Sequence, residues 1–412
     1  MKAVYRVDED RMSSAYAFVG SVLPEALCKE SVACHAAGNK FQIELLKAIQ
    51  SISGLPVFVL STFPVGVFPK SRRVVATPRE VTVRDGMSGW MIPFINILFL
   101  KQITIGVANF LFLSVWLWKN RKKRRLLLVY NLYPPMSLPV LLAARLFGAT
   151  SIAVVPDFPH NLSFNFRGLR GALQRLNVWL EATSLSRFTG IIPLTRYISD
   201  DFAPKHRALV MEGGVSDEEA DAESAPQVKR PESPETVCLF SGTLSDVNGI
   251  ALLLDAFCLI PDPTFRLWIL GRGPLEHLVR KAAADDTRIV YWGFVPNAEV
   301  MRLQRQATLL LNARPTDQLI ARYTFPSKLL EYMLSGRPVL STALPGIPDE
   351  YHQFIHVLLE ANPEALAAMI QRICSRPAAE LDEFGKCSRA FVLGNKTWTQ
   401  QGKRVFEFLE TL

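Results

Sequence analysis

Lys328 and Glu331 are the residues of this chain whose types and spacing most clearly allow chemistry. They lie three positions apart in the stretch "TFPSKLLEYMLSGRPVLST" (residues 324–342). At helical spacing two such residues share one face. An ammonium group can neutralise a phosphate, and a carboxylate can accept hydrogen bonds from two sugar hydroxyls. The other interpretation is an ordinary surface ion pair, which contributes little to stability.

The surrounding pattern predicts the elements that position this pair. Pro326 suits a first helical turn, and a β-branched run follows the helix. From residue 236 onward, near-continuous apolar runs alternate with helical ones. The predicted strands are "TVCLF", "FRLWILG", "RIVYWGF", "TLLLNAR" and "PVLST". Such alternation is typical of a parallel, doubly wound α/β sheet. Ligands bind such sheets where strands end and helices begin, which is where Lys328 and Glu331 lie.

Three further strand-to-helix loops belong to the same predicted edge. They are "FSGTLSDVNG" with Gly242, Thr243, Asn248 and Gly249, "LGRGPLEHL" with Gly271 and Gly273, and "WGFVPN" with Phe294 and Val295. Glycine lets backbone N–H groups approach an anion, and a helix N-terminus adds partial positive charge. Glycine-rich turns of this kind are also common without a ligand, so each loop alone is a weak signal.

Taken in order, these segments resemble the donor-binding domain of retaining GT-B glycosyltransferases of family 4. The resemblance covers roughly residues 236–351 and includes "IVYWGFVPNAEVMRLQRQATLLLNARP" and "LPGIPDEY". It implies two doubly wound Rossmann-like domains facing across a cleft. It also implies transfer of a sugar from a nucleotide-diphosphate sugar, with retention and without a metal or other cofactor. The departing diphosphate would then help to remove the acceptor proton.

The resemblance also implies roles for individual residues. Glu331 matches the glutamate that holds the nucleotide ribose, and Ser327 and Lys328 match positions beside the diphosphate. Gly242 lies in the turn that approaches the diphosphate, while Phe294 and Val295 lie beside the base. The full set of expected donor-binding residues is Gly242, Thr243, Asn248, Gly271, Gly273, Phe294, Val295, Tyr323, Ser327, Lys328, Leu329 and Glu331.

Two positions depart from the family pattern. Tyr323 stands where the first of two glutamates is expected, and Asn248 stands where a lysine is often found. Arg314 or Lys328 could supply the missing cation. The residues expected to act in catalysis are therefore Lys328, Arg314 and Asp157.

The first half of the chain predicts a second α/β domain, which would bind the acceptor. "PVFVLST", "LLLVYNL" and "TSIAVVPDF" read as buried strands. Asp157 and His160 follow the last of these in "VVPDFPHNL". They are the candidate side-chain bases that an inverting enzyme would need, and Asp157 could equally cap a turn before Pro159. Gly38 and Asn39 begin a helix that would line the acceptor cleft, although they could equally form its cap. The predicted domains are residues 1–215 and 236–394, joined by a linker (216–235) and followed by a helix (395–412) packing toward the first domain.

Net charge, cysteine content and one apolar segment indicate the kind of partner and compartment to expect. The formal net charge is +8, which favours an anionic partner. Six scattered cysteines predict a reduced, cytoplasmic protein. The apolar segment before the basic run "KNRKKRR" is too short between Lys101 and Trp118 to span a bilayer. We expect a buried amphipathic helix there. The alternative is peripheral contact with the inner face of the cytoplasmic membrane through Trp116, Trp118 and the basic residues up to Arg125.

Other functions remain open on sequence grounds. A nucleotide-sugar 2-epimerase shares the architecture but needs several histidines and carboxylates in the cleft, and the chain has six histidines in all. A catalytically silent subunit that only binds a sugar nucleotide is compatible with Tyr323 and Asn248. A nucleic-acid partner is not expected, because the basic cluster lacks interleaved stacking aromatics.

Overall fold

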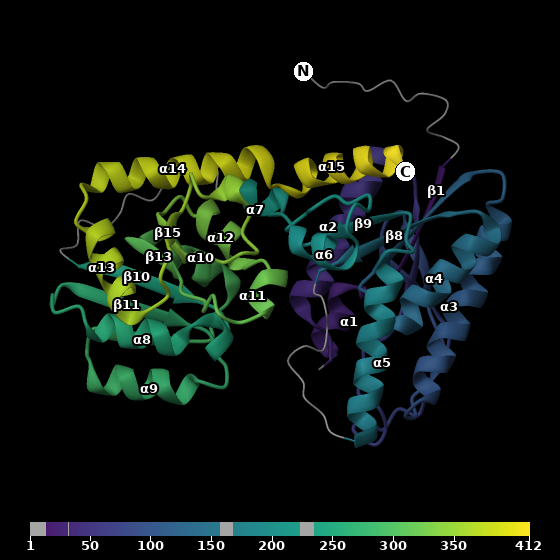
Figure 1. Ribbon diagram of the computed structural model, residues 1–412, viewed down its shortest axis with the longest axis horizontal. Helices are drawn as coiled ribbons and strands as arrows, with labels where there is room; N and C mark the ends of the chain where they lie inside the picture. The colour runs from purple at the N-terminus through teal and green to yellow at the C-terminus, as the bar shows by residue number, and fades with distance from the viewer. Residues whose placement is uncertain (1–13, 32, 157–167, 223–234) are drawn as a thin grey trace. The chain divides into compact units, whose positions relative to one another are not determined.

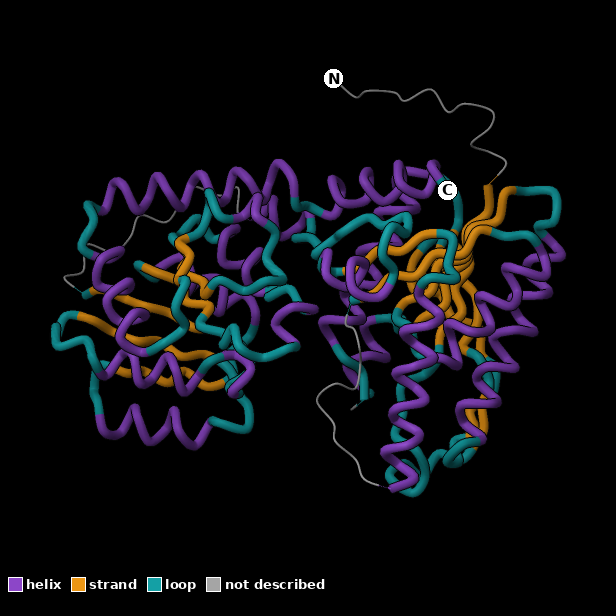
Figure 2. Tube along the Cα trace, viewed as in Figure 1, coloured by secondary structure: helices purple, strands orange, loops and turns teal. Residues whose placement is uncertain are grey.

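A computed structural model describes residues 14–31, 33–156, 168–222 and 235–412 of the chain. The chain divides into two compact units, the first formed by Met1–Glu212 with Gln401–Leu412 and the second by Gly213–Gln400. Each unit contains a largely parallel sheet with helices packed against it (Figures 1 and 2). This arrangement confirms the predicted α/β class with two Rossmann-like domains.

The first unit is built on a seven-stranded sheet of order β4-β5-β2-β1-β7-β8-β9. Only the β4–β5 pair is antiparallel. The strands are β1 (Ser14–Gly20), β2 (Val57–Ser61), β4 (Arg79–Arg84), β5 (Met87–Met91), β7 (Arg124–Tyr130), β8 (Thr150–Val155) and β9 (Gly190–Pro193), with β3 (Val75–Ala76) and β6 (Phe94–Ile95) in a separate ribbon. The helices are α1 (Glu25–Glu30), α2 (Ala36–Ser53), α3 (Leu100–Lys119), α4 (Pro134–Phe147), α5 (Gly168–Leu185) and α6 (Arg196–Phe202).

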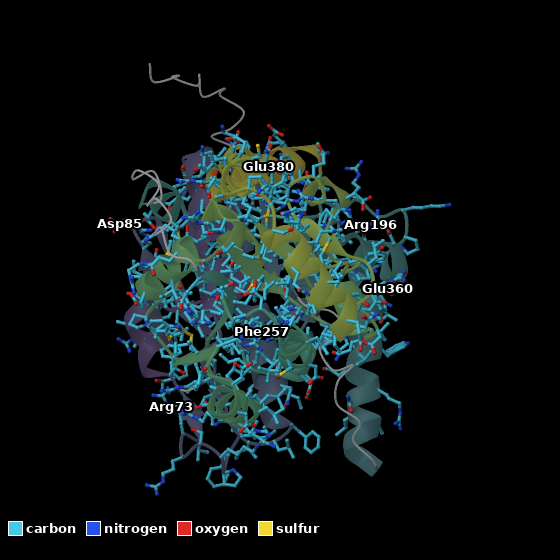
Figure 3. The ribbon with its side chains drawn as sticks, turned by 90° about the vertical axis from the view of Figure 1, so that its left-hand side faces the viewer. Arg73, Asp85, Arg196, Phe257, Glu360 and Glu380 are labelled. Atoms are coloured by element: carbon cyan, nitrogen blue, oxygen red, sulfur yellow. A yellow bond between two sulfur atoms is a disulfide. The ribbon has the colours of Figure 1, made fainter. Side chains whose placement is uncertain are left out.

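The second unit is built on six strands of order β12-β11-β10-β13-β14-β15, all parallel. The strands are β10 (Thr236–Ser241), β11 (Phe265–Leu270), β12 (Ile289–Gly293), β13 (Leu309–Asn312), β14 (Val339–Thr342) and β15 (His356–Leu358). The helices are α7 (Asp217–Ala222), α8 (Ile250–Cys258), α9 (Glu276–Asp285), α10 (Asn297–Gln306), α11 (Ile320–Tyr323), α12 (Lys328–Leu334), α13 (Pro363–Cys374) and α14 (Ala378–Asn395), and α15 (Trp398–Thr411) begins in this unit and continues into the first. Phe257 of α8, labelled in Figure 3, is fully buried in the core of this unit. All five strands predicted in this region are present.

Segments at the ends of the predicted domains differ in part from the prediction. Residues 217–222 of the predicted linker form α7, and residues 223–234 lie outside the described part. From Gln401 onward, α15 belongs to the first unit. Arg124 there forms an ion pair with Glu410 at 3.2 Å, and Arg207 donates to the carbonyl of Thr411 at 2.7 Å.

The prediction of six reduced cysteines is wrong for one pair. Cys28 and Cys34 form a disulfide, and their Cα atoms lie 5.4 Å apart, within the usual range for such a bond. Two cysteines six positions apart match no known framework, so the chain fold and not the spacing determines the pairing. The disulfide removes the support that cysteine usage gave to a reducing compartment.

The prediction for the apolar segment is also wrong in two respects. α3 begins at Leu100, so it includes Lys101 and Gln102 and is 20 residues long. Its mean hydropathy over an 18-residue window is 1.5, yet only 28% of that window is buried. Among the described residues, α3 is the one helix that is long enough and apolar enough to cross a membrane, judged by length and composition alone.

His356 is a half-buried imidazole of the second unit. Burial lowers the pKa of this imidazole to about 4, and the nearby cations Arg376 and Arg372 add to the effect. Its Nε2 is buried and has no hydrogen-bond partner among the residues that the structure describes, and its ring stacks on Phe384 at 4.3 Å.

We therefore expect stability to fall between about pH 6.5 and about pH 4, where the unfolded chain binds a proton that the folded chain excludes. His356→Phe, which keeps the stacking, should flatten this fall in thermal unfolding curves recorded across that range. His277→Gln removes an exposed imidazole of the same unit and should leave the profile unchanged. An equally steep acid loss in His356→Phe would contradict the assignment.

Candidate functional site

The order of strands in the second unit defines where a ligand can bind. From β10 the chain moves outward to β11 and β12, then returns to add β13, β14 and β15 on the other side. β10 and β13 are neighbours, with Cys238 paired to Leu309. In an open parallel sheet the crevice for a ligand lies at the carboxyl ends of two such strands. The loops that begin at Gly242 and Ala313 therefore border the candidate site.

These loops touch one another backbone to backbone. Gly249 has φ +72°, and a Cβ there would lie 1.7 Å from the carbonyl oxygen of Ala313. Gly271 has φ +128°, and a Cβ there would lie 1.9 Å from the carbonyl oxygen of Gly242. No other residue type fits either position without moving the backbone. The glycines noted in the sequence thus bring the loops after β10, β11 and β13 together.

Backbone hydrogen bonds fix the same loops. The amide of Gly242 donates to Leu270 at 3.0 Å, and that of Leu244 donates to Arg272 at 3.0 Å. On the next strand, the amide of Gly271 donates to the carbonyl of Gly293 at 2.7 Å. The three turns after β10, β11 and β12 therefore form one connected edge.

Lys328 and Glu331 lie beside this edge on α12. Lys328 Nζ and Glu331 Oε2 are 2.8 Å apart, and about a third of each side chain is exposed. Leu330, Met333 and Leu334 on the same helix are buried. Because the pair is accessible while its neighbours are buried, it can exchange its mutual contact for contacts with a ligand.

Tyr332 positions α12 against the end of β10, a role that the sequence did not reveal. Its Oη accepts from the amide of Ser241 at 2.8 Å and lies 3.1 Å from the carbonyl oxygen of the same residue. Gln304 donates to Ser241 Oγ at 3.2 Å. Burial raises the pKa of Tyr332 to about 12, so the phenol stays neutral as a hydrogen-bond donor. Tyr332 lies within an apolar helical run, so no local pattern distinguished it from a core residue.

Glu331 and Arg314 both act on Tyr332 electrostatically, the first raising and the second lowering its pKa. Arg314 follows β13, and its carbonyl oxygen accepts from Thr342 Oγ1 at 2.6 Å. The predicted cation, the predicted ribose ligand and the positioning tyrosine therefore belong to one cluster.

Several predicted donor-binding residues have structural contacts of their own. The amide group of Asn248 donates to the carbonyl of Thr243 at 2.7 Å, so it stabilises its own loop. Leu329 is fully buried, and its N–H donates to the carbonyl of Pro326 at 2.8 Å. Tyr323 is buried.

The loop after β12 offers a flat surface. Phe294 is 69% exposed, and the guanidinium of Arg272 lies over its ring at 5.6 Å. Val295 beside it is half-buried. In the neighbouring loop after β11, Gly273 lies against Leu244, and on the other side of β10 Ser327 is exposed before α12.

The predicted acceptor residues fare differently. Asn39 is buried, and its side chain exchanges hydrogen bonds with the backbone of Leu23 at 2.7 and 2.9 Å. It therefore holds the loop after β1. The cap of α2 is His35, whose Nδ1 accepts from the amide of Gly38. Asp157 and His160 lie outside the described residues.

A search of the described residues finds no group of three or more His, Cys, Asp and Glu that could hold a metal ion.

Comparison with known proteins agrees with this geometry. Residues 235–376 match the family model described as Glycosyl transferases group 1. Over 137 residues the chain is 28% identical to the amylovoran biosynthesis glycosyltransferase AmsK of Erwinia amylovora. That match covers 32% of this chain and 34% of the relative, so it spans about a third of the relative's length.

Solved structures match over nearly the whole chain. The UDP complex of Anabaena Alr3699/HepE superposes with a TM-score of 0.64 at 14% identity, covering 97% of this chain and 100% of that one. For sucrose-phosphate synthase from Thermosynechococcus elongatus the TM-score is 0.67 at 14% identity, covering 96% and 98%. At such identities the likeness shows the fold. The chain has the GT-B fold, and together with the family match this supports a glycosyltransferase.

The contact at Gly249 can be tested by adding one methyl group. Gly249→Ala should destabilise the protein by about 3 kcal/mol, because the new Cβ meets the carbonyl of Ala313 and because φ is positive. Gly293 has nearly the same φ, +67°, but nothing within 4 Å of its added Cβ. Gly293→Ala should therefore cost only about 1 kcal/mol. Equal losses for the two variants in chemical denaturation would show that the close approach has no energetic role.

Tyr332→Phe should destabilise the second unit by about 1–3 kcal/mol, because the buried amide of Ser241 loses its acceptor. Tyr291→Phe is the matched control, since its hydroxyl donates to Gly271 from a half-buried position. Urea denaturation measures both. A Tyr332→Phe loss no larger than that of the control would contradict the positioning role.

Proposed function

We propose that this chain is a metal-independent glycosyltransferase of family 4 that transfers a hexosyl group from a nucleotide-diphosphate sugar with retention of configuration. The observation that carries the proposal is the position of Lys328 and Glu331. An accessible cation and carboxylate lie on the helix that Tyr332 fixes to the end of β10, at the switch point of the sheet. This is where a doubly wound sheet binds a nucleotide.

The donor would bind with its parts in a defined order. Glu331 would accept hydrogen bonds from both ribose hydroxyls, and the base would lie along the loop of Phe294 and Val295. The diphosphate would lie by Gly242, Ser327 and Lys328. Solved complexes of the similarly folded HepE contain UDP and UDP-glucose, which supports a nucleotide-sugar donor.

Lys328 and Arg314 would act on the leaving group. As the bond between the anomeric carbon and the diphosphate oxygen breaks, negative charge grows on that oxygen, and fixed cations stabilise it. The acceptor oxygen would bond to the same face of the anomeric carbon. Its proton would pass to the departing diphosphate, so no side-chain base is needed and no cofactor enters.

The acceptor would be a lipid-linked or polysaccharide chain. One relative is named for amylovoran biosynthesis, and one structure of similar fold is a lipopolysaccharide outer core galactosyltransferase. The proposal locates the enzyme in the cytoplasm of a bacterium, at the inner face of the cytoplasmic membrane. There it would contribute to cell-envelope polysaccharide.

Substitution of the pair tests the donor site. Glu331→Ala should weaken nucleotide binding roughly 10- to 100-fold, the effect of losing a charged hydrogen-bond acceptor. Lys328→Ala should lower kcat more than it raises KM, since the charge it neutralises grows in the transition state. The matched control is the ion pair of Lys386 and Glu383 on α14, which has the same spacing in the same unit. Alanine at both control positions should leave binding and turnover unchanged.

A panel of UDP-, GDP- and ADP-sugars identifies the donor by thermal shift and then by release of the nucleoside diphosphate. Stabilisation by none of them would contradict the proposal. Binding without transfer or hydrolysis would indicate a silent binding subunit. Conversion of the bound sugar at C2 would indicate an epimerase.

A further inference from the structure

One side of α3 is unlike an ordinary helix surface. Every exposed side chain from the start of the helix to Trp118 is large and apolar, with exposed fractions from 43% to 60%. We call this set the α3 stripe: Leu100, Ile103, Val107, Leu111, Val115 and Trp118. Three exposed residues just before the helix, Ile97, Leu98 and Phe99, extend it. Contiguous exposed apolar surface of this kind marks an interaction site.

The opposite side of α3 is held in the first unit. Leu113 and Leu117 are fully buried there, and Asn109 donates to the carbonyl of Pro135 at 3.2 Å. Trp116 stacks on Phe58 at 5.9 Å, so the predicted membrane contact through Trp116 does not fit its position. In Figure 1, α3 lies beside α4 along its length. The helix could not cross a bilayer without leaving this packing, so the α3 stripe lies along the surface of the unit.

Positive charge lies at both ends of the stripe. Lys119, Arg121, Lys122 and Lys123 are exposed at the carboxyl end of α3. Lys70, Arg72 and Arg73 are exposed at the other end, on a loop tied to the segment before α3. The side chain of Asn96 donates to the carbonyl of Arg73 at 2.7 Å. Figure 3 labels Arg73.

The sequence that contains α3 and its basic carboxyl end carries no acidic residue. Residues 86–156 contain eight Lys and Arg residues and not one Asp or Glu. Within the described part of the chain, none of the seven exposed cations at the ends of the stripe forms an ion pair. The surface is therefore an apolar strip between two uncompensated cationic ends.

We propose that the α3 stripe docks this protein on an anionic lipid bilayer, with α3 parallel to the membrane plane. The apolar side chains enter the boundary between headgroups and acyl chains, and the two basic ends contact anionic headgroups. A helix of 20 residues is about 30 Å long, so the two ends reach separate headgroups.

Charge also argues against a second copy of this chain as the occupant. In a two-fold antiparallel contact, Lys122 and its neighbours would face the loop of Arg72 in the other copy. A parallel contact would bring each basic end against the same basic end of the other copy. Either arrangement places like charges together in the interface, and their repulsion costs free energy. Contact with anionic lipid carries no such cost.

The inference identifies the surface through which the proposed enzyme would contact the membrane, and it does not depend on donor binding. It would bring the first unit to the surface where a lipid-linked acceptor resides.

Sedimentation of the full-length chain with lipid vesicles tests the proposal. The vesicles contain phosphatidylcholine alone or with about one third phosphatidylglycerol, enough to create a negative surface potential. The wild type should bind the anionic vesicles and lose affinity as salt is raised. Ile103→Gln with Leu111→Gln should weaken this binding at least about tenfold, because two inserted side chains are lost. Both positions are exposed, so folding should be preserved.

The matched control replaces exposed leucines elsewhere, Leu259→Gln with Leu359→Gln, and should bind as the wild type does. Equal binding by wild type and Ile103→Gln/Leu111→Gln would overturn the proposal, as would no preference for anionic vesicles. Resistance of bound protein to alkaline carbonate would show a spanning helix instead. A dimer in sedimentation velocity that the same substitutions dissociate would identify a second copy as the occupant. Thermal shift with UDP in the double variant, without vesicles, tests the donor site separately.

Discussion

The candidate site depends on backbone groups that approach one another more closely than any side chain would allow. At Gly249 and Gly271 the added methyl of alanine would lie within 2 Å of a carbonyl oxygen in the neighbouring loop. Because these contacts join the loops after β10, β11 and β13, the backbone at the switch point is held in place without a ligand. Preformed backbone geometry of this kind removes an entropy cost from binding. Tyr332 adds a further connection, because its hydroxyl joins α12 to the end of β10.

The second unit could be predicted from the sequence because each of its signals is local. Parallel strands buried on both faces are apolar throughout, and each of the five predicted ones ends in a glycine or polar loop. The loop glycines and the helix of Lys328 and Glu331 were found in the same way. The residues that join these parts were not. Tyr332 and Gln304 are ordinary helical residues in the sequence, and only the tertiary fold brings both to Ser241.

The first unit was harder to predict, for a physical reason that α3 illustrates. Hydrophobic periodicity shows that a segment is apolar, but it does not show what covers the apolar surface. α3 reads as a core helix, yet one of its sides packs on α4 and Phe58 while the other remains exposed. The Cys28–Cys34 disulfide is a similar case, since the turn between α1 and α2, and not the spacing, brings the two residues together. For Asn39 the polarity was noticed, but its partner, the backbone of Leu23, lies in another loop.

The two departures from the family pattern can be considered together. Tyr323 replaces a carboxylate and Asn248 replaces a cation, so together they leave the formal charge of the site unchanged. What changes is where the charge lies. Asn248 stabilises its own loop, and the two cations expected to act on the leaving group, Arg314 and Lys328, both follow β13. If a diphosphate is bound here, its neutralisation comes from the β13 side and not from the turn after β10. A cation stabilises the charge on a leaving group according to the distance between them, whichever loop carries the cation. A cation on the β13 side can therefore serve the same chemistry as one in the turn after β10.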